Sequence, residues 1–198
     1  MLNLSDLEKK INSELGTKIK DSKIKHGQIY ISISSDDLLE TVSSLKTNNN
    51  TKFKQLIDIT AIDYPESQKR FKMVYLFLSH ELNHRIILSY SINENQQIHS
   101  LTKIFPSANW MEREIFDMYG IKFTNHPDLR RILTDYGFEG YPLRKDFPLT
   151  GHTEVRYSEN NKKVIYEPVK LEQNYRTFDY ESPWEGTKYI KEQRKKSE

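Results

Sequence analysis

The chain begins with apolar side chains at helical spacing. These side chains recur three or four positions apart, at Leu4, Leu7, Ile11 and Leu15. Ser5 and Glu8 are spaced as a capping box, and Gly16 has the conformational freedom that a helix end requires. Together these signals predict a helix over the first fifteen residues.

A short strand and a second helix are expected next. Residues 28–32 alternate between apolar and polar side chains, which is typical of a strand with one buried face. Apolar side chains then return to helical spacing at Leu38, Val42 and Leu45. Ser34 or Ser35 is the expected cap of this helix, and the three asparagines at 48–50 are its expected end.

Three strand-like runs follow, at 53–64, 71–79 and 85–92, with no room for helices between them. We therefore expect them to pair antiparallel. In the run at 71–79 the odd-numbered and the even-numbered positions are both mainly apolar, so both faces of the expected strand are apolar. This predicts a central strand covered on each side. The run at 85–92 has one apolar and one mainly polar face, which predicts a half-exposed strand.

A helix rich in charged residues follows a turn at 101–105. Ser107 is its expected cap, and Gly120 is its expected end. Arg113 and Asp117 lie four positions apart within it, so composition alone would assign them to an ordinary surface ion pair.

The C-terminal quarter has a different composition. Residues 151–198 contain only six Ile, Leu and Val side chains, too few to bury a core of their own. They are nevertheless aromatic, with Tyr157, Tyr166, Tyr175, Phe178, Tyr180, Trp184 and Tyr189. Aromatic side chains on an irregular segment indicate an arm that packs on another surface. Packing of this segment back onto its own domain is the alternative.

These patterns predict an α+β fold. A two-layer domain over 1–106, with a mostly antiparallel sheet packed by helices, is followed by a helix and loop segment over 107–151. A long irregular C-terminal arm over 152–198 completes the chain.

Composition removes several classes of function. The 30 basic and 28 acidic side chains leave a net charge of +2, which is a weak electrostatic basis for binding nucleic acid. Cysteine is absent, so the chain has no thiolate ligands for zinc or iron–sulfur clusters and no cysteine nucleophile. The longest apolar run, 73–78, is six residues, whereas a bilayer span needs roughly 20. Residues 1–8 lack the pattern of a signal or transit peptide, and we expect neither.

The histidine, serine and glycine patterns do not indicate a metal, hydrolytic or nucleotide-binding site. His80 and His84 have the spacing of helical metal ligands, but the residues between them are typical of a turn between strands. No serine lies in a glycine-flanked nucleophile turn, and the seven glycines form neither a GxGxxG nor a Walker motif. We therefore expect no metal site, hydrolytic centre or nucleotide site in this chain.

A specific pattern begins in the charged helix. It consists of Glu112-Arg113-Glu114, Asp117-Met118-Tyr119-Gly120, His126-Pro127, Leu129-Arg130-Arg131 and Pro142-Leu143-Arg144-Lys145-Asp146-Phe147-Pro148-Leu149. This pattern resembles the signature of the 30-kDa subunit of respiratory complex I, the family also called the C subunit of NADH-quinone oxidoreductase. The end of the chain, over 169–185, resembles the short single-subunit form of that family.

Two positions depart from the family pattern. Asn125 stands where many members have glycine, and asparagine is the other residue that readily adopts a left-handed backbone. Tyr141 stands where many members have histidine, which argues against metal or proton chemistry at that position.

The resemblance implies a peripheral subunit of the proton-translocating NADH:quinone oxidoreductase that carries no redox group. Electrons would pass from NADH through FMN and iron–sulfur clusters in other subunits to quinone, and this chain would bind no cofactor. The expected partner is the 49-kDa subunit, which is the D subunit of complex I, with subunits B and I nearby. The chain would lie on the cytoplasmic side of a bacterial inner membrane, or on the matrix side in mitochondria, and would reach the membrane only through the complex.

The motif residues are then expected to stabilise a loop and contact partners rather than to catalyse. They are Glu112, Arg113, Glu114, Asp117, Tyr119, Gly120, His126, Pro127, Arg130, Arg131, Arg144, Lys145 and Asp146. The basic pairs at 130–131 and 144–145 lie among carboxylates, which favours a self-neutralised network over freely solvated charges. The equivalent subunit of a membrane-bound [NiFe] hydrogenase-like complex is one alternative, and an independent enzyme or RNA-binding domain is another.

Overall fold

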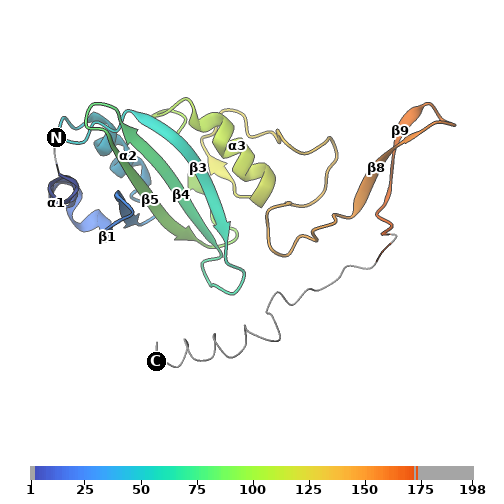
Figure 1. Cartoon of the computed structure of the whole chain (residues 1–198), viewed down its shortest axis with the longest axis horizontal. Coiled ribbons are helices and arrows are strands. Elements are labelled where there is room, and N and C mark those ends of the chain that lie inside the picture. The colour runs from blue at the N-terminus through green and yellow to red at the C-terminus, as the bar shows by residue number, and fades with distance from the viewer. Residues whose placement is uncertain (1–2, 172, 174–198) are drawn as a thin grey trace, which may run out of the picture. The chain divides into compact units, whose positions relative to one another are not determined.

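The computed structural model describes residues 3–171 and residue 173 (Figure 1). They form two compact units, of which the first ends at Gly151 and the second begins at His152. The helices are α1 (Leu4–Leu15), α2 (Leu38–Thr47) and α3 (Ala108–Tyr119), with a short 3-10 helix η1 (Gly16–Lys18). The strands are β1 (Ile19–Lys25), β2 (Gln28–Ile33), β3 (Gln55–Asp63), β4 (Phe71–Ser79), β5 (His84–Ile92), β6 (Ile98–His99), β7 (Phe123–Thr124), β8 (Thr153–Ser158) and β9 (Lys163–Pro168).

The main sheet has five strands in the order β1-β2-β5-β4-β3. β2 and β5 run parallel, and the other neighbouring strands run antiparallel. The predicted α+β class with a mostly antiparallel sheet is therefore confirmed. β4 lies inside the sheet as predicted, although β5 rather than β4 is its middle strand.

The sequence does not predict β1. Polar side chains fill most of this strand, which is the exposed edge of the sheet, so no apolar alternation marks it. A turn at His26 and Gly27, with positive φ angles of 50° and 72°, joins it to β2. Such two-residue turns match the twist of a hairpin.

The core lies on one face of the sheet. Met73 pairs with Tyr90 across β4 and β5, Tyr75 pairs with Leu88, and all four side chains are buried. The buried side chains of α1, α2 and α3 belong to the same apolar cluster, so the helices cover this face. Figure 1 shows β3, β4 and β5 without a helix in front of them.

The prediction that the strand at 71–79 is covered on both sides was wrong. Its second face carries Val74, Leu76 and Leu78, which are only partly buried and lie outside the core cluster. An apolar strand face predicts burial, but it does not reveal whether the covering surface belongs to the same chain.

The starts of α1 and α2 differ from the predicted caps, whereas α3 starts after Ser107 as predicted. α1 begins at Leu4, and the carbonyl of Asn3 accepts the first backbone hydrogen bonds, so Ser5 lies inside the helix and forms no capping box. α2 starts after Asp37 rather than at the serines, and Ser107 stands at the cap position of α3 without a side-chain bond. The helix ends at Gly16 and Gly120 were predicted correctly, since both glycines have positive φ angles.

The second unit contains a hairpin where an irregular arm was expected. β8 and β9 pair antiparallel from Thr153 with Pro168 to Ser158 with Lys163. Alternating β-branched and aromatic residues on both sides of a polar turn explain the pairing, and the small number of apolar residues had concealed it. The predicted aromatic arm beyond residue 173 lies outside the described residues. Within the described part of the chain, every helix is too short or too polar to cross a membrane.

Candidate subunit interface

Asp117, in the last turn of α3, organises the loop that follows the helix. One carboxylate oxygen accepts hydrogen bonds from the backbone N–H groups of residues 132, 133 and 134 at 3.0, 2.7 and 3.0 Å. The other accepts the hydroxyl of Thr134 at 2.6 Å. Burial opposes ionisation, but these four hydrogen bonds prevail and lower the pKa of Asp117. A fully buried, ionised carboxylate thus fixes the loop.

Arg131 closes the same loop from the other side. Its guanidinium donates to the carbonyls of Phe138 at 2.9 Å and Gly140 at 2.6 Å, and its Nε lies 3.5 Å from Asp117. It also faces the ring of Tyr141, with 5.1 Å between the guanidinium carbon and the ring centroid. Arg131 therefore contacts three residues of the segment 126–141, namely Phe138, Gly140 and Tyr141. We call this segment the signature loop.

Arg113 does not pair with Asp117, contrary to what helical spacing suggests. Its Nε donates to the carbonyl of Arg130 at 2.9 Å, and its Nη2 to that of Arg131 at 3.4 Å. Arg130 instead forms a bidentate pair with Asp128 at 2.7–3.0 Å. Arg130 and Arg131 thus each lie close to a carboxylate, and most of their hydrogen-bond acceptors belong to the signature loop.

Glu112 of α3 and His126, the first residue of the signature loop, form a buried pair. Both side chains are fully buried, and Glu112 Oε2 lies 3.8 Å from His126 Nε2. Glu112 Oε1 accepts the backbone N–H of Leu101 at 2.7 Å, whereas Oε2 has no hydrogen-bond partner among the described residues. Burial raises the pKa of Glu112 to about 7, because the charged form loses its hydration.

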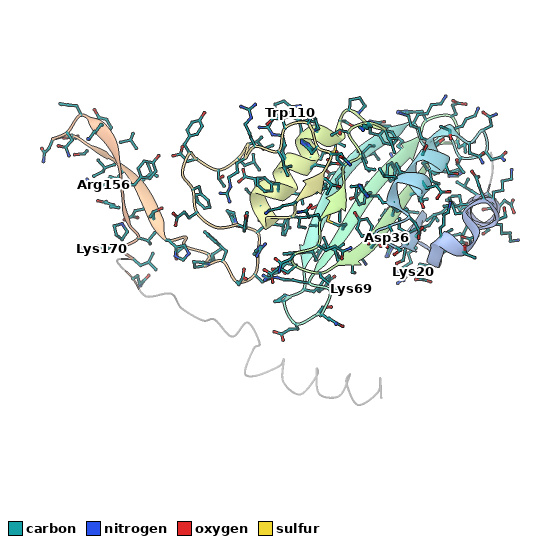
Figure 2. The ribbon with its side chains drawn as sticks, turned by 180° about the vertical axis from the view of Figure 1, so that it is seen from behind. Lys20, Asp36, Lys69, Trp110, Arg156 and Lys170 are labelled. Carbon is teal, nitrogen blue, oxygen red and sulfur yellow. The ribbon has the colours of Figure 1, made fainter. Side chains whose placement is uncertain are left out.

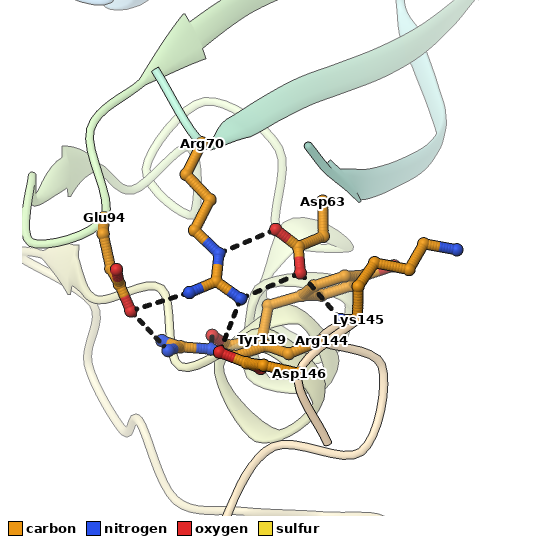
Figure 3. Close-up of polar contacts among 7 residues, drawn as sticks. All are labelled: Asp63, Arg70, Glu94, Tyr119, Arg144, Lys145 and Asp146. Atoms are coloured by element: carbon orange, nitrogen blue, oxygen red, sulfur yellow. Dashed lines mark hydrogen bonds and ion pairs between the residues drawn. The ribbon is translucent and has the colours of Figure 1, made fainter. Parts of the chain in front are cut away.

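Asp63, at the end of β3, is the centre of a second cluster (Figure 3). Its two oxygens accept hydrogen bonds from Arg70 at 2.8 and 3.0 Å, and Oδ2 also accepts the backbone N–H of Lys145 at 2.8 Å. Arg70 pairs further with Asp146 at 2.8 Å and Glu94 at 3.1 Å. The hydrogen bonds and charge of Arg70 outweigh desolvation and lower the pKa of Asp63.

Arg144 links this cluster to the end of α3. Its Nε donates to the carbonyl of Tyr119 at 2.6 Å, and its Nη1 pairs with Glu94 at 2.7 Å. Gly120 packs directly beneath, with a φ of 79°, and a Cβ there would lie 2.6 Å from the ring of Tyr141 and 2.8 Å from Arg144 Nη2. Glycine is required at this position both for the backbone conformation and for the close contact.

The structure thus gathers most of the motif residues into two clusters. The first, around Asp117, holds Arg113, Arg130 and Arg131, with Glu112 and His126 below them. The second, around Asp63, holds Tyr119, Gly120, Arg144, Lys145 and Asp146. Glu114 and Pro127 are exposed, and Lys145 contributes its backbone rather than its side chain. Among the described residues, no three His, Asp or Glu side chains are placed to hold a metal ion.

Sequence reasoning missed Asp63, Arg70 and Glu94, which lie outside the motif. One signal was available, because Asp63 continues the buried alternation of Ile59 and Ala61 along β3. A carboxylate at a buried strand position indicates a paired charge. Its partner 82 residues away could not be inferred from spacing.

A groove of about 680 Å³ opens on the outer side of the signature loop. Trp110, labelled in Figure 2, lines this groove together with Tyr136. Trp110 is 65 % exposed and Tyr136 is fully exposed. Arg113 stacks on Trp110 at 5.4 Å, and Arg130 and Arg131 complete the basic lining. Exposed tryptophan, tyrosine and arginine are the side chains that most often dominate protein interfaces.

Comparison with known families decides the identity. Residues 31–153 match the family described as respiratory-chain NADH dehydrogenase, 30 Kd subunit. The chain belongs to this family. The matched range contains both clusters and the groove, so the geometry described above is that of the 30 Kd subunit family.

Relatives named as the C subunit of NADH-quinone oxidoreductase align over nearly the whole chain. The protein from Ruegeria pomeroyi is 52 % identical over 191 residues, covering 94 % of this chain and 96 % of the relative. The protein from Rhizobium meliloti is 48 % identical over 187 residues, covering 94 % and 93 %.

One solved structure shares the fold. It is a chain in the membrane-bound sulfane sulfur reductase, an archaeal respiratory membrane complex, with a TM-score of 0.64 and 22 % identity. The match covers 73 % of this chain and 85 % of the other. At this identity the match shows the fold alone, and the near-full-length relatives favour the NADH-quinone oxidoreductase over a hydrogenase-like complex.

Proposed function

We propose that this chain is a scaffolding subunit of the NADH-quinone oxidoreductase that carries no redox group. Electrons pass from NADH to quinone through FMN and iron–sulfur clusters held by other subunits, while this chain braces the hydrophilic arm near the quinone-reducing end. Its main contact is the 49-kDa subunit, with subunits B and I nearby. The chain lies on the cytoplasmic side of the membrane and is held there by the complex.

Two observations together support this proposal: the signature loop is held by internal hydrogen bonds, and aromatic side chains beside it are exposed. Buried Asp117 and half-buried Arg131 use their hydrogen bonds within the chain, so the signature loop keeps one shape without a partner. Leu133 and Tyr136 of the loop and Trp110 of the adjoining helix α3 are each at least 61 % exposed. A rigid loop that exposes large apolar side chains lowers the entropic cost of association.

The hairpin of the second unit supports the same role. Val155, Tyr157 and Val164 share one face of the hairpin, and each is more than half exposed. The opposite face carries the ion pair of Arg156 with Glu167 at 2.7 Å. Two strands alone are marginally stable in water, so an apolar face of this kind favours packing against a partner subunit.

Capture of the tagged chain from mildly solubilised membranes tests the proposal. The 49-kDa subunit and subunits B and I should be recovered with the wild-type chain. A Trp110→Ala and Tyr136→Ala double variant should recover at least fivefold less of the 49-kDa subunit, because it removes the exposed aromatic anchors. Tyr64→Ala is the matched control, since Tyr64 is 48 % exposed but lies outside the groove. Equal recovery by the double variant and the control would refute the interface.

The absence of a redox group is tested on the purified chain. Absorbance, flavin fluorescence and iron analysis should find neither FMN nor an iron–sulfur cluster. Flavin or iron in stoichiometric amount would contradict the proposal, whatever the capture experiment shows.

A further inference from the structure

The face of the main sheet opposite the helices is apolar at its centre. Tyr30 of β2 pairs with Ile87 of β5, and Ile87 pairs with Leu76 of β4. Val74 and Leu78 flank Leu76 on the same side of β4. All five side chains are partly exposed. We call this surface the open sheet face.

The helices described in the structure do not cover this face. Their buried side chains belong to the core cluster on the other side of the sheet, and none of the five residues of the open sheet face belongs to that cluster or packs against it. An antiparallel sheet with one face in water normally carries polar side chains there. The apolar centre is therefore unusual for a surface that faces only solvent.

Charged side chains around this centre are mainly basic. Lys72, Arg85 and Lys25 point to the same side of the sheet as Leu76, according to their cross-strand partners. None of these three takes part in an ion pair with another described residue. Asp58, the cross-strand partner of Leu76, is a carboxylate on the same face. The rim therefore keeps an excess of positive charge.

We propose that the open sheet face docks an amphipathic helix of another subunit, with acidic side chains flanking its apolar stripe. Neighbouring strands lie about 4.8 Å apart, so Tyr30, Ile87 and Leu76 span about 10 Å, the diameter of one helix. A strand would bind at a sheet edge rather than on a face. The apolar side chains of this face are only partly exposed, so it is poorly suited to insertion into a bilayer.

This docking goes beyond the role of the signature loop. The open sheet face contains none of the motif residues, and it lies on strands that the loop does not form. The two surfaces can therefore be tested independently.

Photocross-linking in the assembled complex tests the proposal. The full-length chain carries p-benzoylphenylalanine in place of Leu76, and mass spectrometry identifies the attached peptide after irradiation of the membranes. We expect a helical segment of another polypeptide with apolar residues at i, i+3 or i+4 and i+7, and with Asp or Glu beside them. The same substitution at Asn12, on the exposed side of α1, is the control and should not give this peptide.

Cross-links to lipid, to a second copy of the chain, or to a strand or loop would overturn the proposal. So would a segment without flanking acids, or no cross-link from a chain that is present in the complex. All these outcomes are read from the cross-linked product of a chain whose signature loop is unchanged. They therefore do not depend on whether the Trp110 and Tyr136 variants assemble.

Substitutions on the face give a second test. A Leu76→Thr and Ile87→Thr double variant keeps residues that favour strands, so the purified chain should retain its thermal midpoint within a few degrees. We expect the amount of complex that contains this chain to fall at least fivefold. A Lys72→Glu and Arg85→Glu double variant should act similarly, whereas Lys9→Glu with Lys10→Glu, on exposed positions of α1, should not. Normal assembly of both face variants would overturn the proposal.

Discussion

The backbone N–H of Lys145 donates a 2.8 Å hydrogen bond to the carboxylate of Asp63, which lies 82 residues earlier at the end of β3. The same carboxylate accepts two bonds from Arg70. The end of the motif is therefore fastened to the main sheet at a buried charge. Any change at Asp63 should be transmitted to the segment that precedes the second unit.

Replacement of Asp63 by Asn should destabilise the first unit strongly. Asp63 is fully buried and Arg70 is only 12 % exposed, so the variant leaves a nearly buried guanidinium without its main carboxylate. Loss of one partner of a buried pair costs about 3 to 5 kcal/mol. Urea unfolding of the full chain at pH 7 measures the loss. Asp21→Asn removes the exposed pair with Lys23 and should leave the midpoint unchanged within error. Equal effects of both variants would contradict the central role of Asp63.

Asp117 should contribute to stability above about pH 4 and lose this contribution in acid. Burial opposes ionisation, but four hydrogen bonds outweigh it and lower the pKa of Asp117 in the folded chain from the ordinary value of 3.8. The folded state therefore binds fewer protons than the unfolded state near pH 3, and stability falls as the pH drops through the folded pKa. Unfolding free energies between pH 7 and pH 2.5 should fall less steeply for Asp117→Asn. A parallel fall in both proteins would refute this.

Glu112 should act in the opposite direction. Its pKa is raised from 4.5 to about 7, so the folded state holds a proton that the unfolded state releases. Stability should decline as the pH rises from about 4.5 to 7 and then level off, by about 3 kcal/mol for the full shift. Glu112→Gln should remove this decline and raise stability at pH 8 relative to the wild type. Unfolding titrations from pH 4 to pH 8 compare the two, and an unchanged slope in the variant would assign the decline to another group.

Gly120 and Gly137 should respond differently to alanine. Both have positive φ angles, 79° and 74°, so each substitution strains the backbone by about 1 kcal/mol. A Cβ at Gly120 also collides with Tyr141 and Arg144, whereas a Cβ at Gly137 meets nothing within 4 Å. We expect Gly120→Ala to cost at least twice as much as Gly137→Ala in urea unfolding. Equal costs would show that the packing at Gly120 relaxes freely.

Local patterns predicted most elements of the fold but not how the strands are ordered. Periodicity located α1, α2, α3 and the three long strands, because each buries one face against the core. It missed β1, whose polar side chains serve an exposed edge, and the hairpin of the second unit. The starts of α1 and α2 were misplaced because the serines that the pattern favoured make no capping bonds, whereas α3 begins after Ser107 as predicted. The first helical turns rest instead on the backbone carbonyls of Asn3 and Asp37.

The motif was recognisable from sequence, but its chemistry was not. Spacing suggested a pair between Arg113 and Asp117, whereas the carboxylate turns inward to three backbone N–H groups. Such contacts depend on the path of the loop, which has no periodicity to reveal it. Asn125, expected to adopt a left-handed backbone, has a φ of 62° as predicted.

The parallel pairing of β2 with β5 affects the order in which the chain can fold during synthesis. β2 ends at Ile33, but its neighbour begins only at His84, so the first hairpin leaves the ribosome long before its partner strand exists. Parallel pairing requires closure of this long intervening segment, which is slow compared with hairpin formation. The edge of β2 that pairs with β5 should therefore remain unpaired until β5 emerges, which makes this interval the one in which a nascent chain most needs protection from aggregation.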